Sequence, residues 1–207
     1  MTWIVAAMAA VLVLCSGCGN DERATPTEQA EEAASALEDV PLREEEAPDG
    51  LEASERGTGP IETIREVLPP RSAVPNLPPV PTAVFRGFRG GYQVVYVRSG
   101  EGEGPASAAS SAIRFAGADA ASTFMAYFRE AQVGAGRGTE RVELSVAGLG
   151  DEGFGWHIEE PLSESSTIVW RAGDLVLTVT LGGPIGTATP ERAQSLARRM
   201  DGRIAGS

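Results

Sequence analysis

His157 is the only histidine in the chain, so any catalytic triad or histidine-ligated metal site must use it. It lies in a segment, 154–158, where apolar residues alternate with small or polar ones, which places His157 on the polar face of a strand. Four carboxylates flank it in the sequence: Asp151, Glu152, Glu159 and Glu160. These residues could form a cation site, but charged residues along one strand face are ordinarily solvated. We therefore expect a solvated strand face and no metal site.

Nucleophilic chemistry is restricted by the types of residue present. All 17 basic residues are arginine, which excludes a P-loop, a Schiff base, a pyridoxal phosphate anchor and a lysine general base. The two cysteines, Cys15 and Cys18, end an apolar N-terminal run, so the chain after them has no disulfide, thiol nucleophile or cysteine-ligated zinc. Ser163, Ser165 and Ser166 are expected in a turn, with no histidine base at a recognisable spacing. The sequence thus predicts no catalytic residue and no cofactor.

Three further patterns in the sequence are relevant to binding or catalysis. The glycine-rich segment 134–138 is similar to a phosphate loop, but it ends a predicted helix, whereas a dinucleotide loop opens one after a strand. Four aromatic residues could line a pocket, but we expect them in the core: Phe85, Tyr92, Trp156 and Trp170. The 14 acidic residues between 81 and 207 leave open a carboxylate-dependent hydrolase, which needs two acidic residues held close in a cleft.

The N-terminus has the pattern of an export signal. Residues 3–15 are 13 consecutive apolar positions, fewer than the roughly 20 that a membrane-spanning helix needs. The following sequence, Leu14-Cys15-Ser16-Gly17-Cys18, resembles the lipobox of bacterial lipoproteins. This resemblance implies that 1–17 is a signal peptide and that Cys18 is lipidated, anchoring the chain to the outer face of a bacterial membrane in the cell envelope. An ordinary cleaved signal and a short buried helix are the alternatives.

The segment from 18 to 80 is predicted to be a disordered tether. Residues 19–80 hold 15 acidic residues against 5 arginines, with few aromatic or β-branched clusters, and six prolines lie between 69 and 81. Residues 81–207 hold 14 acidic residues against 12 arginines, so most of the formal charge of -12 lies in the predicted tether. A near-neutral domain behind an acidic arm lacks the positive field that binds phosphate backbones, so nucleic acid is not an expected partner.

The pattern from 81 to 207 predicts one α+β domain, an antiparallel sheet packed by two helices. Strands are expected at 83–85, 92–97, 111–115, 141–146 and 154–158, with a turn at 87–91 and a loop at 99–109. A hairpin is expected from 168–170 and 175–181 around the turn 171–174. One helix should begin at Asp119 and end at Gly134, and another should begin after Thr189 and run to Ile204.

Three segments, 148–154, 169–176 and 197–204, resemble sequences of uncharacterised bacterial envelope lipoproteins. Such proteins often carry PsbP-like or sensor-type α+β domains, which implies a binding or accessory role, and no functional residue is carried over. We therefore expect a membrane-tethered, non-catalytic envelope module whose partner is an unidentified envelope protein or small molecule. A ligand-sensing domain and a carboxylate-dependent hydrolase are the alternatives.

Overall fold

The computed structural model describes residues 32, 35–68, 79–100, 102–135 and 140–205. It contains an α+β fold, as the sequence predicts. Its elements are η1 (Glu44–Glu46), β1 (Leu51–Ala53), β2 (Gly59–Ile61), η2 (Ile64–Glu66), α2 (Thr82–Gly87), β3 (Phe88–Arg98), β4 (Ser107–Phe115), α3 (Ala118–Ala135), β5 (Arg141–Leu144), β6 (Glu152–Glu159), β7 (Glu164–Ala172), β8 (Leu175–Gly183) and α4 (Pro190–Ala205). No helix in these described ranges is long and apolar enough to cross a membrane.

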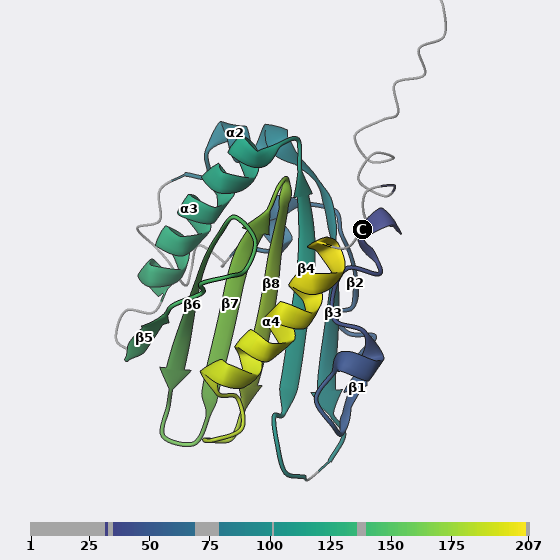
Figure 1. Ribbon diagram of the computed structural model, residues 1–207, viewed down its shortest axis with the longest axis vertical. Helices are drawn as coiled ribbons and strands as arrows, with labels where there is room; N and C mark the ends of the chain where they lie inside the picture. Colours follow the sequence, from purple (N-terminus) through teal and green to yellow (C-terminus); the bar gives the residue numbers. More distant parts are fainter. Residues whose placement is uncertain (1–31, 33–34, 69–78, 101, 136–139, 206–207) are drawn as a thin grey trace, which may run out of the picture.

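The strands form one antiparallel sheet in the order β1-β3-β4-β8-β7-β6-β5, and β2 also pairs with β3 (Figure 1). The predicted hairpin of β7 and β8 is confirmed, with Ala172 opposite Leu175. Gly91 allows β3 and β4 to pair closely, because a Cβ at this position would lie 2.7 Å from the carbonyl oxygen of Ala112. In this order the central strands β4, β8 and β7 each have a neighbouring strand on both sides.

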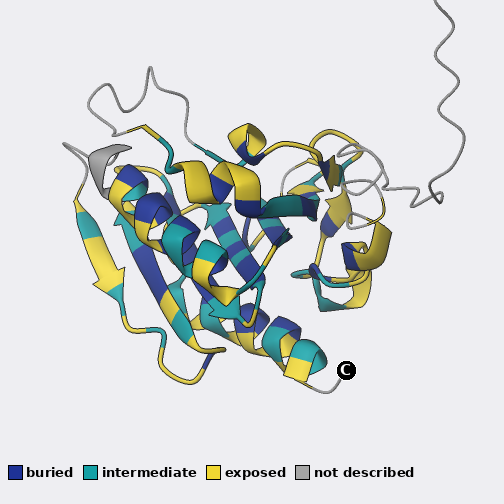
Figure 2. Cartoon of the chain, turned by 90° about the horizontal axis from the view of Figure 1, so that it is seen from above, coloured by how far each residue is buried: buried dark blue, intermediate teal, exposed yellow. Residues whose placement is uncertain are grey.

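The two long helices pack on opposite faces of this sheet. On β7, Ile168 and Trp170 join the core beneath α4, whereas Val169 joins the core beneath α3. The alternation follows from the period of two along a strand, which sends neighbouring side chains to opposite faces. Figure 2 shows the buried residues concentrated in the central strands and on the helix sides that face them. Both helices thus bury the apolar stripes that the sequence predicts.

The prediction that 18–80 is a disordered tether is wrong for residues 35–68, which belong to the folded domain. Five apolar side chains of this stretch are at most 7% exposed: Leu37, Leu42, Leu51, Ile61 and Ile64. β1 and β2 both pair with β3, so the folded unit begins well before the predicted boundary at 81. The prediction from composition is wrong here because this segment has only isolated apolar residues among many acidic ones. These apolar residues are buried against a sheet that other segments form. The predicted signal peptide at 1–17, and residues 18–31, 33–34 and 69–78 of the predicted tether, lie outside the described residues.

Other differences concern the first part of the predicted domain. Residues 83–85 lie in α2 and not in a strand, and the helix starts directly after Pro81, whose fixed φ suits a helix start. The turn expected at 87–91 is mostly the beginning of β3, and β4 begins at Ser107, inside the expected loop. Glycine and serine at these positions indicated turns, but pairing with neighbouring strands outweighs that local preference. The expected elements from 118 onward are confirmed, except that β5 stops at Leu144 and β7 begins earlier than expected, at Glu164.

Candidate binding cleft

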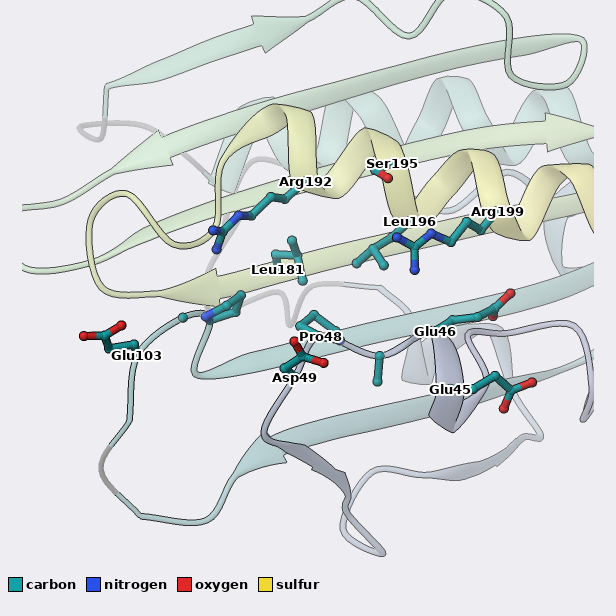
Figure 3. A pocket seen from close by; sticks show the side chains of 13 residues that line it. Glu45, Glu46, Pro48, Asp49, Glu103, Leu181, Arg192, Ser195, Leu196 and Arg199 are labelled. Atoms are coloured by element: carbon teal, nitrogen blue, oxygen red, sulfur yellow. The ribbon is translucent and has the colours of Figure 1, made fainter.

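A cleft of about 510 Å³ lies between α4, the η1 region and the loop that precedes β4 (Figure 3). Its size falls in the range of small-molecule sites, which is roughly 300–1,000 Å³. Leu181 of β8 and Leu196 of α4 line its apolar part, and both are nearly inaccessible. Charged side chains line the rest, and they come from three segments that are far apart in the sequence.

The α4 wall presents Arg192, Ser195 and Arg199 to the cleft. The helix starts with the expected signal, and hydrogen bonds to its own backbone N–H and to the Thr189 hydroxyl lower the pKa of Glu191 in the first turn. Its buried stripe, Ala193, Leu196, Ala197 and Met200, faces the sheet. The spacing of three and four residues between the arginines and the serine places them together on the flank of that stripe. The apolar stripe therefore fixes the direction in which both guanidinium groups project.

The opposite wall is the N-terminal strap, which we define as residues 35–53. Arg203 of α4 holds it, because Nη2 donates to the carbonyl oxygens of Val40 and Pro41 at 2.8 Å each, and Nη1 pairs with Glu46. Charge-assisted hydrogen bonds of this kind are about twice as strong as neutral ones. The strap therefore sits at a defined distance from α4.

A second set of hydrogen bonds fixes the strap to the sheet. The backbone N–H of Leu42 donates to Ser110 Oγ at 2.9 Å, and the Tyr96 hydroxyl donates to the carbonyl oxygen of Leu42 at 2.8 Å. Burial, followed by the charges of Glu44, Glu46 and Glu45, raises the pKa of Tyr96 above its ordinary value of 10.0. The neutral phenol is thus the form that fits this site, as a donor to a carbonyl requires.

Arg98 joins the strap to the third wall of the cleft, the loop before β4. Its Nε donates to the carbonyl oxygen of Pro105 at 3.1 Å and its Nη2 to that of Asp49 at 3.0 Å. Gly50 and Gly102 make room for the guanidinium, since a Cβ at either position would lie within 2.8 Å of Arg98 Nη1. This arrangement positions Asp49 on the strap wall and Glu103 on the loop wall of the cleft.

Charges of opposite sign line the cleft without neutralising each other. Glu45, Asp49 and Glu103 lie on the strap and loop walls, and Arg192 and Arg199 lie on α4. Within the part of the chain that the structure describes, none of these five side chains forms an ion pair within 4.0 Å. Arg192 donates only to the carbonyl oxygen of Thr187. The cleft is therefore wide enough to keep an acidic and a basic wall apart.

His157 lies elsewhere, and its surroundings differ from the predicted solvated strand face. Its side chain is 14% exposed, and Nδ1 is 2.9 Å from Ser166 Oγ. Ser166 is fully buried in β7 and donates to the carbonyl oxygen of Ala188, while Glu164 accepts from the Ala188 N–H. The predictions of a turn for Ser165 and Ser166, and of no histidine near them, are wrong because pairing of β6 with β7 places Ser166 opposite His157.

This cluster has the residue types of a catalytic triad but not the arrangement. The hydroxyl proton of Ser166 is engaged by the Ala188 carbonyl at 2.6 Å, so Oγ can only accept from His157. A nucleophile needs the reverse, with its proton directed to the histidine and its oxygen open to substrate. Glu164 Oε2 lies 3.9 Å from Nε2 of His157. The cluster thus ties the β8–α4 connection to β7 and β6.

The proposed cation ligands do not come together. Asp151 and Glu152 lie at the opposite end of β6 from Glu159, and both pair with Arg171, at 2.7 and 2.6 Å. The hydrogen bond from Arg171 lowers the pKa of Glu152, the opposite of what a general acid near neutral pH requires. Within the described ranges, no group of three or more histidine, cysteine, aspartate or glutamate residues could hold a metal ion.

The remaining residues that the sequence suggested for a site belong mostly to the core or lie outside the described residues. Trp156 and Trp170 are core residues, and Trp170 Nε1 donates to Asp201 at 2.9 Å. Tyr92 is half-buried, whereas Phe85 is 44% exposed, so the core expectation for Phe85 is wrong. Residues 136–138 of the glycine-rich segment and Cys18 fall outside the described residues. The cleft residues themselves were missed, because two of its walls lie in the predicted tether and in a predicted surface loop.

Comparison with known proteins gives one informative likeness. Neither a protein-family model nor a curated protein matches the sequence. Among solved structures, the chain is similar to the extracellular domain of PknH from Mycobacterium tuberculosis. The two share 13% sequence identity with a TM-score of 0.53, over 86% of this chain and 97% of that one. At this identity the likeness shows a common fold, and it extends over nearly the whole of the PknH domain.

Proposed function

We propose that this protein is a non-catalytic binding module of the bacterial envelope, tethered by a lipid on Cys18, that takes a small ligand in the cleft beside α4. The observation that carries the proposal is the cleft itself, where opposite charges line facing walls without pairing. Unpaired charges that converge on a concave, partly apolar space are the usual mark of a ligand site. The fold shared with an extracellular domain supports an extracytoplasmic location.

The residues around the cleft favour binding over catalysis. The cleft contains no histidine, cysteine or lysine, and its acidic residues Glu45, Asp49 and Glu103 are exposed. A carboxylate-dependent hydrolase needs one carboxyl that is shielded enough to stay protonated near neutral pH. Glu46, the least exposed acid of the wall, is paired with Arg203 instead. These features support the non-catalytic alternative.

Ligand sensing is the second candidate function, and one observation favours it. The similar structure is the extracellular domain of PknH, which carries this fold outside the membrane. Here the strap that forms one wall of the cleft is also the part of the domain nearest in sequence to the predicted lipid anchor. A ligand that contacts both walls would stabilise the strap against α4, and this change would reach the anchored end of the chain.

The tether is tested by intact-mass spectrometry of the protein recovered from the membrane fraction of its host. The proposal expects an N-terminus at Cys18 that carries a diacylglyceryl group, and expects a Cys18→Ala variant to lack both the modification and the membrane association. Recovery of an unmodified mature chain in the soluble fraction would contradict lipid tethering and leave the proposal for the cleft unaffected.

The binding role of the cleft is tested by saturation-transfer NMR of the full chain against a panel of water-soluble fragments. A Ser195→Trp variant fills the cleft from α4, and Leu162→Trp adds the same ring at a residue that is 88% exposed and does not line the cleft. We expect a set of fragments to bind the wild type and Leu162→Trp but not Ser195→Trp. If no fragment distinguishes the two variants, the cleft is not a ligand site.

A further inference from the structure

We infer that the cleft ligand is a dipolar ion, a short peptide with free termini and small apolar side chains, which binds with its carboxylate on α4 and its ammonium group on the strap. This inference rests on the proposed binding function and adds the chemical class of the ligand. It follows from the placement of charge and of apolar surface around the cleft.

The α4 wall is suited to a carboxylate. Arg199 has no hydrogen-bond or ion-pair partner among the described residues, and Arg192 uses one N–H on the Thr187 carbonyl. Guanidinium groups bind carboxylates through two parallel hydrogen bonds, which gives them both orientation and affinity. Figure 3 shows the Arg199 side chain lying along α4 beside Leu196, on the α4 side of the cleft. A carboxylate placed there would gain charge-assisted bonds that the protein itself does not provide.

The facing wall is suited to an ammonium group. Arg203 neutralises Glu46, which leaves Glu45 and Asp49 on the strap and Glu103 on the loop as unpaired carboxylates. In Figure 3 the carboxylate of Asp49 points from the strap toward α4. An ammonium group has donors and no acceptor, so at the Asp49 carboxylate it would gain a charge-assisted bond that the protein itself does not provide.

A ligand with a single charge fits this cleft less well than a dipolar one. Screening in physiological salt acts over about 8 Å, so charges lining one cleft of this size are felt across it. A plain anion would gain from Arg192 and Arg199 but would be repelled by three carboxylates, and a plain cation would meet the reverse. Only a ligand that carries both charges, directed to opposite walls, gains from each.

The floor between the two walls selects small apolar side chains. Leu181 and Leu196 lie there, together with Pro48 of the strap and Pro105 of the loop. These side chains provide no polar partner to a bound side chain. Small apolar side chains would lie over this floor without losing hydrogen bonds, while the termini reach the charged walls.

The test uses trialanine and its three end-blocked forms, N-acetylated, C-amidated and doubly blocked, titrated into the full chain by calorimetry. These probes share side chains and differ only in terminal charge. We expect trialanine to bind at least about tenfold more tightly than either singly blocked form, the loss typical of one charge-assisted contact. The doubly blocked form should bind most weakly.

Two matched variants assign each terminus to its wall. Arg199→Gln should reduce the preference for a free carboxylate over an amide while keeping the preference for a free amine, since Arg192 remains on the α4 wall. Asp49→Asn should do the opposite, reducing only the preference for a free amine. Loss of both preferences in either variant would contradict the assignment of termini to walls.

The outcomes separate the ligand class from the proposed function. If all four peptides bind equally and Ser195→Trp abolishes their binding, the cleft binds ligands but the dipolar class is wrong. If trialanine does not bind up to its solubility limit, the class is also overturned, while the fragment panel still decides whether the cleft is a ligand site. Selective binding of trialanine with the two variant patterns above would support both proposals.

Discussion

Leu42→Ala tests the largest departure of the structure from the sequence prediction, the incorporation of the strap into the fold. Leu42 is 1% exposed and belongs to the core cluster beneath α4. Its backbone is held from both sides, by Ser110 Oγ and by the Tyr96 hydroxyl. If the strap is folded as described, truncating this side chain leaves a cavity in the core. If the strap is a tether, the same truncation changes nothing.

The expected loss follows from the burial of the side chain. Removing three carbons costs about 2.4 kcal/mol of transfer free energy, at about 0.8 kcal/mol for each buried methylene. The remaining cavity adds a smaller cost, limited because a strap at the edge of the domain can move inward to fill part of it. We expect Leu42→Ala to lower the free energy of unfolding by about 3 kcal/mol, which corresponds to a melting temperature lower by roughly 6–12 °C.

The assay is urea unfolding of the full chain followed by tryptophan fluorescence, since Trp156 and Trp170 are buried in the two cores. Leu162→Ala is the matched control, because Leu162 is 88% exposed and should change the stability by less than about 0.5 kcal/mol. An effect of Leu42→Ala no larger than that of the control would refute the reasoning and restore the tether interpretation for this segment.

Three further perturbations probe the strap and the turn before β6. Arg203→Met should cost about 2 kcal/mol in urea unfolding through lost charge-assisted bonds to the strap, against less than about 0.5 kcal/mol for Arg198→Met on the exposed side of α4. Because the pKa of Tyr96 is raised on folding, wild-type stability should fall as the pH rises above about 10. Tyr96→Phe should lower the free energy of unfolding by about 1 kcal/mol at neutral pH, and its stability should fall less than that of the wild type at alkaline pH. An alkaline fall equal to that of the wild type would contradict this account. Gly150→Ala, at φ +45° with a Cβ that would overlap a β7 carbonyl oxygen, should cost more than about 3 kcal/mol by thermal melting. Gly148→Ala, at φ +82° in open space, should cost only about 1 kcal/mol, and equal losses would show that the overlap is relieved.

The elements that could be predicted from the sequence are those whose own residues show which face is buried and where the element begins or ends. α4 is flanked by a start signal and carries apolar residues on one face, and these features place it correctly from Pro190 onward. The β7–β8 hairpin alternates on both sides of a short turn at Gly173, which has φ +62°. The strand prediction for residues 83–85 is wrong because a run of three apolar residues fits a strand or a helix equally well. The preceding Pro81 favours the start of a helix, and these residues lie in α2.

The candidate cleft could not be predicted, because no single segment carries its pattern. Arg199 is one of several exposed arginines of α4, and only its position in the lining of the cleft gives it the role that we propose. The acidic side chains of the strap were counted as part of a uniformly acidic arm. Asp49 is held in place through its own backbone, because its carbonyl oxygen accepts a hydrogen bond from Arg98 of β3. Such long-range contacts leave no periodic trace in the sequence.

His157 illustrates a second limit of prediction from sequence, because residue types alone do not show how their hydrogen bonds are directed. The sequence places it on a strand face correctly, but it gives no information on where the proton of a nearby hydroxyl is directed. A serine, a histidine and a glutamate lie together here, yet the Ala188 backbone accepts from Ser166 and donates to Glu164. The same three residue types would be catalytic only if that backbone were absent and the serine oxygen faced a substrate. For this reason the ligand site that we propose is the cleft beside α4, where charged groups lack partners, and not this cluster.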